Sequence, residues 1–249
     1  MAGLDWLTAR PVAHRGLHDA AAGIIENTAS AFEAAIAGNF AIECDVQLSA
    51  DGEAMVHHDH ALGRLTEGEG PLRAKTAAQL RQVPFKATAD RMLSLGKLCD
   101  LTYGRVPLVI EIKSQFNDER ALAERAVEVL RSYPGPAALM SFDPDVVSAV
   151  REAAPGITRG IVAERHYRHG EWARLSAAQK RSMAHLLHIA TTRPHFVAYH
   201  VKDLPAPAPL AVRYVFGLPL LTWTVRTPED RETAARWASQ VIFEGFRPA

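Results

Sequence analysis

Short apolar runs alternate with longer amphipathic segments along almost the whole chain. Eight such runs stand at residues 11–14, 41–48, 108–113, 137–141, 158–163, 196–202, 220–225 and 240–244. Strands that alternate with helices are typical of parallel sheets joined by helical crossovers. Eight such units in 249 residues match the size of a closed barrel, which takes about 250 residues. We therefore predict an α/β fold, a (β/α)8 TIM barrel.

Residues that favour helix N-termini stand before several of the intervening segments: Asn27 or Thr28, Asp118, Asp143-Pro144 and Thr227-Pro228. Ser, Thr, Asp and Asn accept hydrogen bonds from the first free N–H groups of a helix, and proline suits its first turn. The helix after Thr28 is expected to end at Gly38, because glycine is frequent at helix C-termini.

Two segments interrupt the regular alternation. Residues 51–105 are too long for a single link between strand and helix, so we expect a small insertion after the second strand, with a hairpin, a loop and one or two helices. Residues 205–209 read PAPAP, and we expect them to be extended, because proline restricts φ and lacks an N–H donor. Residues 1–249 are interpreted as a single barrel domain that contains the segment at about 51–105.

Composition excludes several classes of protein. The 28 Lys and Arg residues balance 28 Asp and Glu residues, so no basic surface favours nucleic acid. Cys44 and Cys99 are too few for a disulfide scaffold and are expected to be buried thiols. No run reaches the 18 to 20 apolar residues of a membrane span, and the opening MAGLDWLTARPVAHRG lacks a signal-peptide core. We expect a cytoplasmic protein without stable membrane insertion.

Acidic side chains share one face of two predicted strands. Glu43 and Asp45 alternate along AIECD and point to the same side, which in a barrel is the interior. Glu111 and Lys113 share a face of LVIEIK in the same way. Buried carboxylates need a compensating charge. The pattern leaves two interpretations open: a site for a hard cation such as Mg²⁺ or Ca²⁺, or a buried salt-bridge network.

Two histidines near strand ends suggest proton-transfer chemistry. His14 ends the first predicted strand and precedes Arg15, and His58 precedes Asp59. Histidine donates or accepts a proton near neutral pH, as general acid–base catalysis requires. The planar guanidinium of Arg15 suits an anionic oxygen.

With these residues in place, the chain resembles the glycerophosphodiester phosphodiesterase family. The resemblance rests on motifs that follow the family's order across nearly the whole chain: His14-Arg15-Gly16, Glu26-Asn27-Thr28, Glu43-Cys44-Asp45-Val46, Asp51-Gly52, His58-Asp59 with Leu62, Arg64 and Thr66, Glu111-Ile112-Lys113, Ser141-Phe142 and Trp223-Thr224-Val225. Each triplet alone has little specificity, whereas the ordered set is specific.

The resemblance implies a metal-dependent enzyme that hydrolyses glycerophosphodiesters to glycerol 3-phosphate and an alcohol, in lipid and glycerol metabolism. It implies that Glu43, Asp45 and Glu111 hold a divalent cation, Mg²⁺ or Ca²⁺. The catalytic histidines match His14 and His58. Further positions would bind substrate, with Arg15 and Lys113 on the phosphate oxygens and Trp223 on the alcohol portion.

Some features depart from the family. Arg226 stands where asparagine is frequent, and the chain ends QVIFEGFRPA in place of a glycine-aspartate signal. Two alternatives stay open: Glu244 and Arg247 take part of that role, or the position is unused. These changes leave the preferred alcohol open. Which histidine is the acid, whether water attacks directly or a cyclic phosphate forms, and whether the chain forms a homo-oligomer also stay open.

Two alternatives to this function are kept. One is a lysophospholipase D-type activity on lysophospholipids, which requires an apolar path for the acyl chain. The other is a catalytically silent barrel that binds phosphate esters or a protein partner. The complete set of histidines and carboxylates argues against a silent barrel.

Overall fold

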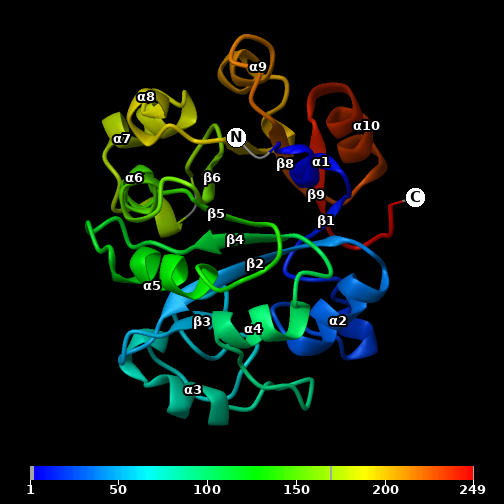
Figure 1. The fold of residues 1–249 in the computed structure, drawn as a ribbon, viewed down its shortest axis with the longest axis vertical. Coiled ribbons are helices and arrows are strands. Elements are labelled where there is room, and N and C mark those ends of the chain that lie inside the picture. The colour runs from blue at the N-terminus through cyan, green and yellow to red at the C-terminus, as the bar shows by residue number, and fades with distance from the viewer. Residues whose placement is uncertain (1–2, 169, 249) are drawn as a thin grey trace.

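The computed structural model describes residues 3–168 and 170–248. Within these residues, parallel strands follow one another around a closed barrel in the order β1, β2, β4, β5, β6, β7, β8 and β9, and β9 returns to pair with β1 (Figure 1). The strands are β1 (Val12–Ala13), β2 (Ala41–Leu48), β4 (Leu108–Ile112), β5 (Ala137–Ser141), β6 (Thr158–Ala163), β7 (Phe196–His200), β8 (Leu220–Val225) and β9 (Gln240–Phe243). The predicted TIM barrel is confirmed.

Helices surround the strands on the outside of the barrel (Figure 1). They are α2 (Ala29–Ala37), α4 (Leu95–Thr102), α5 (Ala121–Leu130), α6 (Pro144–Ala153), α7 (Ala177–Ala184), α8 (Ile189–Thr192), α9 (Pro207–Tyr214) and α10 (Pro228–Trp237). The predicted start of α6 is confirmed, because Asp143 caps it and Pro144 occupies its first turn. Thr227 caps α10 as predicted, in a reciprocal arrangement with Asp230.

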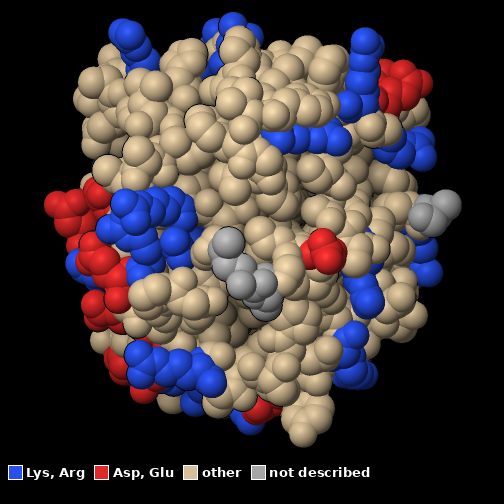
Figure 2. Space-filling model, turned by 45° about the horizontal axis from the view of Figure 1, so that its top comes forward, with Lys and Arg blue, Asp and Glu red and all other residues tan. Residues whose placement is uncertain are grey.

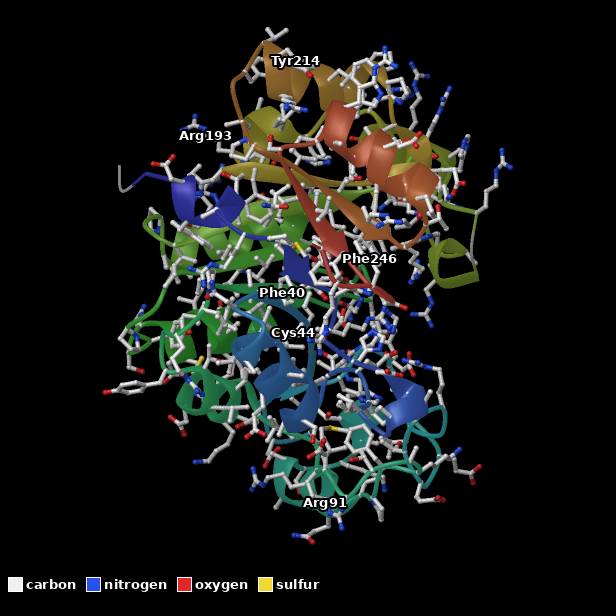
Figure 3. All side chains as sticks on the ribbon, turned by 90° about the vertical axis from the view of Figure 1, so that its right-hand side faces the viewer. Phe40, Cys44, Arg91, Arg193, Tyr214 and Phe246 are labelled. Atoms are coloured by element: carbon white, nitrogen blue, oxygen red, sulfur yellow. The ribbon has the colours of Figure 1, made fainter. Side chains whose placement is uncertain are left out.

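The barrel has two apolar layers, which follow from the alternation of side chains along each strand. Ile42, Cys44 and Val46 face outward and pack among the helices. Ala41 and Val109 face inward, where Leu7 of α1 (Asp5–Thr8) closes the N-terminal end of the barrel. Both cysteines are free and buried. In Figure 3, the labels of Phe40 and Cys44 stand in the middle of the molecule, whereas Arg91 and Tyr214 lie at opposite ends.

An insertion follows the second barrel strand, as predicted. β3 (Ala54–Val56) pairs antiparallel with β2, so the two strands form the expected hairpin. η2 (Leu72–Ala74) and α3 (Ala77–Gln82) follow, and this segment buries apolar side chains of its own around Met55, Leu80 and Met92. The hairpin turns the chain back along β2, so that the backbone N–H of His57, directly after β3, donates to Asp45 O at 3.0 Å.

Two local predictions were wrong. Asp118 does not cap a helix, because it has a positive φ of 60° and α5 begins three residues later, after Arg120. The PAPAP segment is not extended throughout, because α9 starts at Pro207 with Ala206 at its N-cap. Proline is compatible with the first turn of a helix, where its missing N–H would have no partner within the helix.

The described surface carries charges of both signs. On the face shown in Figure 2, basic and acidic side chains stand close together along the left margin and at the upper right. In the described part of the chain, no helix combines the length and the apolar character that crossing a bilayer requires.

Tight packing inside the barrel leads to a stability prediction at Gly160 of β6. An added Cβ there would overlap the ring of Phe196, which is fully buried in the inner apolar layer. We expect Gly160→Ala to lower the free energy of unfolding by about 1–3 kcal/mol, because the core cannot expand without strain. Urea unfolding measures this loss. Gly156→Ala is the matched control, since a Cβ there meets open space, and equal stability of the two variants would contradict the prediction.

Candidate active site

The carboxyl ends of the barrel strands surround a cavity of about 320 Å³. Enzymes with this fold carry their active sites at this end of the barrel, because the loops after the strands converge there. The polar part of the cavity lining includes His14, Arg15, Glu43, His58, Glu111 and Lys113. The structure therefore brings residues from four separate parts of the chain into one site.

Three carboxylates form an acidic cluster at this end of the barrel, and two of them, Glu43 and Glu111, line the cavity. Asp45 and Glu111 lie side by side on neighbouring strands, since β2 and β4 pair at these residues. Oxygen atoms of Glu43, Asp45 and Glu111 lie within 4.8 Å of one another, and all three side chains are buried. The sequence placed these residues on inward faces, but the register between β2 and β4 is what puts them in contact.

Two cations neutralise part of the acidic cluster. Lys113 Nζ lies 2.8 Å from Asp45 Oδ1 and 2.6 Å from Glu111 Oε1. Arg15 Nε lies 3.2 Å from Asp45 Oδ2, and Asn27 Nδ2 donates to the same oxygen at 2.8 Å. Burial would raise the pKa of Asp45, but Lys113 and Arg15 outweigh it and hold that pKa well below its usual range. A salt-bridge network is therefore present.

Glu43 is less well compensated than Asp45. Its Oε2 accepts a hydrogen bond of 2.8 Å from the backbone N–H of Arg15, and His14 Nε2 lies 4.0 Å from the same oxygen. Burial and the neighbouring charges of Asp45 and Glu111 raise the pKa of Glu43 well above its usual range. An added cation would relieve this repulsion. The donor set, made of carboxylate oxygens alone, suits a hard divalent cation.

Each of the two histidines has a carboxylate on its Nδ1. His14 Nδ1 lies 2.8 Å from Glu244 Oε2, just after β9, and Glu244 Oε2 also accepts from Arg226 at 2.9 Å. His58 Nδ1 lies 2.8 Å from Asp59 Oδ1. A carboxylate accepts only from a protonated ring nitrogen, so both contacts favour the tautomer with Nε2 free to exchange a proton.

These supports extend into charged networks. Arg64 holds Asp59 through Nε at 2.6 Å and reaches Glu26 at 2.7 Å, and Glu26 in turn binds Arg15 at 2.7 Å.

Burial lowers the pKa of His14 to about 4, although the hydrogen bond to Glu244 opposes that shift. The histidine is thus neutral near pH 7 in the protein without ligands.

The remaining predicted residues take different places. Trp223 on β8 lines the cavity, and its Nε1 donates to Ala198 O at 3.1 Å. Glu244 lies beside the site, where it contacts Nδ1 of His14. Arg247 lines a separate depression beside α10 and not the cavity that holds His14.

Sequence reasoning assigned no role in the site to several residues of the cavity wall, among them Phe116, Phe142, Glu164 and Trp172. Phe142 and Glu164 directly follow β5 and β6, so their position at the carboxyl ends of predicted strands was a usable signal. Trp172 and Phe116 lie in connecting segments, and no pattern in the sequence distinguishes them from ordinary core residues.

Comparison with known proteins adds independent evidence. Residues 14–246 match the model of the glycerophosphoryl diester phosphodiesterase family. A glycerophosphodiester phosphodiesterase of Caldanaerobacter subterraneus is 29% identical over 161 residues, which cover 61% of this chain and 65% of that protein. A probable glycerophosphodiester phosphodiesterase 1 of Mycobacterium tuberculosis is 30% identical over 168 residues, covering 58% and 60%. The chain thus spans less than two thirds of the length of these relatives.

A solved structure shares the fold. The Oleispira antarctica phosphodiesterase, solved in complex with the product sn-glycerol-3-phosphate, superposes with a TM-score of 0.77 at 20% identity and covers 97% of this chain and 95% of that one. The family match begins at His14 and runs past Glu244, so it contains every residue of the acidic cluster and both histidines. This chain therefore belongs to the glycerophosphoryl diester phosphodiesterase family.

Proposed function

We propose that this protein is a metal-dependent phosphodiesterase that hydrolyses glycerophosphodiesters to glycerol 3-phosphate and an alcohol. The observation that carries the proposal is the meeting, at one end of the barrel, of three buried carboxylates and two histidines whose Nδ1 atoms are each held by a carboxylate. Family membership supports the reaction class.

Glu43, Asp45 and Glu111 would hold the metal, Mg²⁺ or Ca²⁺. A bound divalent cation polarises a phosphoryl oxygen and neutralises charge that builds up in the transition state. The charges around the cluster support this assignment. The three carboxylates with Arg15 and Lys113 leave one negative charge, and a divalent cation would turn it into one positive charge. A phosphodiester carries one negative charge, so the loaded site would be its complement.

Side chains of the protein would bind the phosphate and transfer the protons. Arg15 and Lys113 would hold the non-bridging phosphate oxygens, an electrostatic contribution that is preorganised because both side chains are already fixed by Asp45. One histidine would take a proton from the attacking oxygen through Nε2, and the other would give a proton to the departing alcohol. The geometry suits either assignment of His14 and His58.

A direct assay tests this function. We expect the purified protein with Mg²⁺ or Ca²⁺ to release glycerol 3-phosphate from glycerophosphodiesters, measured by coupled oxidation of the product. Lysophosphatidylcholine, tested alongside, addresses the lysophospholipase D alternative. Hydrolysis of the lysolipid alone would contradict the proposal, and hydrolysis of neither compound would favour a silent barrel.

From the sequence we further propose that the protein is cytoplasmic, that it binds a small-molecule substrate and not nucleic acid, and that it forms a homo-oligomer.

Glu244 is expected to act by positioning His14. We predict that Glu244→Gln lowers kcat by about 100-fold with little change in KM, because an amide can donate to Nδ1 and so favour the wrong tautomer. The pH profile of kcat should shift as well, which a purely structural role would not cause. Glu244→Asp should recover part of the activity. The control is Glu232→Gln on the surface of α10, and an unchanged kcat and pH profile in Glu244→Gln would refute the role.

A further inference from the structure

The cavity has two chemically different halves. The strands β1, β2 and β4 contribute the acidic cluster, the cations and His14. The other half, formed by segments that follow β4 to β8, carries several aromatic rings among polar and aliphatic side chains (Figure 1 shows the positions of these strands). The rings that line this second half are Phe116, Phe142, Trp172, His200 and Trp223. Binding of phosphate needs only the first half, so the aromatic half is available for the rest of a substrate.

The aromatic rings form a continuous chain. Ring centroids are 5.9 Å apart for Phe116 and Trp172, 4.8 Å for Trp172 and Phe142, and 5.4 Å for Phe142 and Trp223. The first and last of these pairs stand nearly perpendicular, at 76° and 86°. Rings that meet at such angles form adjoining walls, so a group between them contacts more than one π-system.

One acidic residue belongs to this aromatic half. Glu164 follows β6, lines the same cavity and is 9% exposed. Its backbone N–H donates to the hydroxyl of Tyr167 at 3.3 Å, and the Tyr167 ring packs on Trp172 at 5.2 Å. The backbone of Glu164 is therefore tied to the aromatic unit, and its side chain lines the same cavity.

From this arrangement we propose that the aromatic half binds a quaternary ammonium group, so that the preferred substrates are glycerophosphodiesters of a choline-like alcohol. This inference rests on the proposed function. Cations of this kind have no N–H to donate, and proteins recognise them by ring faces, with a nearby negative charge adding attraction. The rings come from Phe116, Phe142, Trp172 and Trp223, and Glu164 supplies the charge.

Other occupants fit this half less well. A polyhydroxylated alcohol such as glycerol loses hydrogen bonds to water on entering and needs several polar partners in return, whereas Ser141 and Arg226 in this half already bind Ile112 O and Glu244. A long acyl chain needs an extended apolar groove. The volume of about 320 Å³ stands at the lower end of the roughly 300–1,000 Å³ typical of small-molecule sites, and it must also hold the phosphate.

The selectivity of hydrolysis tests the proposal. We expect kcat/KM to be higher for glycerophosphocholine than for glycerophosphoethanolamine or glycerophosphoglycerol. In Glu164→Gln and Phe116→Leu, the ratio of kcat/KM for the choline ester over the glycerol ester should fall about tenfold, the size of a cation–π contact shielded from water. Phe116 is partly exposed at the edge of the cluster around Trp172, and leucine keeps an apolar side chain there. Glu232→Gln and Phe216→Leu, on the surface, are the matched controls.

A binding measurement separates this inference from the proposed function. Tetramethylammonium should quench the tryptophan fluorescence of the wild-type protein saturably, and both variants should weaken that binding about tenfold. If no ester is hydrolysed, the proposed function fails and this titration alone decides the inference. The inference is overturned if the wild-type enzyme shows no preference for the choline ester, if both variants keep the wild-type ratio, or if tetramethylammonium does not bind.

Discussion

Replacing His14 or His58 with alanine is expected to reduce kcat by about 10²–10⁴-fold in each case, because each removes one proton transfer from the reaction. Both side chains line the same cavity, and both have Nδ1 occupied by a carboxylate at 2.8 Å. The proton-transfer role therefore falls on Nε2 in both residues. Steady-state kinetics with a glycerophosphodiester at saturating metal measures the loss.

A double variant tests whether the two histidines act in the same step. If the two histidines act in one concerted step, His14→Ala combined with His58→Ala should cost little more than the larger single loss, because groups that act as a unit are not additive. His185→Ala, an exposed position at the end of α7, serves as the control and should keep activity. Full activity in either single variant would remove that histidine from the mechanism, and circular dichroism of each variant would show whether the fold is retained.

Removal of divalent metal is expected to abolish activity, and Glu43→Gln to raise the metal concentration needed for half-maximal rate. Loss of residues that only support a ligand typically costs about 10–100-fold in metal affinity, so loss of a direct carboxylate should cost at least as much. Glu43 is the informative position, because its pKa is raised by burial and by its acidic neighbours, whereas Asp45 already has Lys113 and Arg15. Titration of Mg²⁺ or Ca²⁺ into chelator-treated protein measures the change.

A second readout keeps this test independent of catalysis. A ligand that binds only the folded protein stabilises it by about 2.7 kcal/mol at a concentration of 100 Kd. The thermal midpoint of the wild-type protein should therefore rise on addition of metal, and that of Glu43→Gln should rise less at the same concentration. Glu33→Gln, an exposed carboxylate on α2, is the control. If exhaustive chelation changes neither the activity nor the thermal midpoint, the acidic cluster is a salt-bridge network and not a metal site.

Much of the barrel could be predicted from local patterns. The run at 41–48 forms β2 over the expected residues, and alternation along it placed Glu43 and Asp45 inside and Cys44 outside. The predictions failed where local preference competes with chain geometry. Asp118 is a good cap in isolation, but the backbone there takes a left-handed turn before α5.

The sequence by itself therefore determined the barrel strands and their inward faces, because the period of apolar residues is a local property of the chain. It also supplied the candidate residues for the chemistry. Only the tertiary structure decided which of them touch. The contact between His14 and Glu244 joins residues 230 positions apart and exists because β9 closes the barrel against β1. The ring of Trp172 reaches the cavity from a loop after β6. Such contacts depend on strand register and loop path, which no short stretch of sequence encodes.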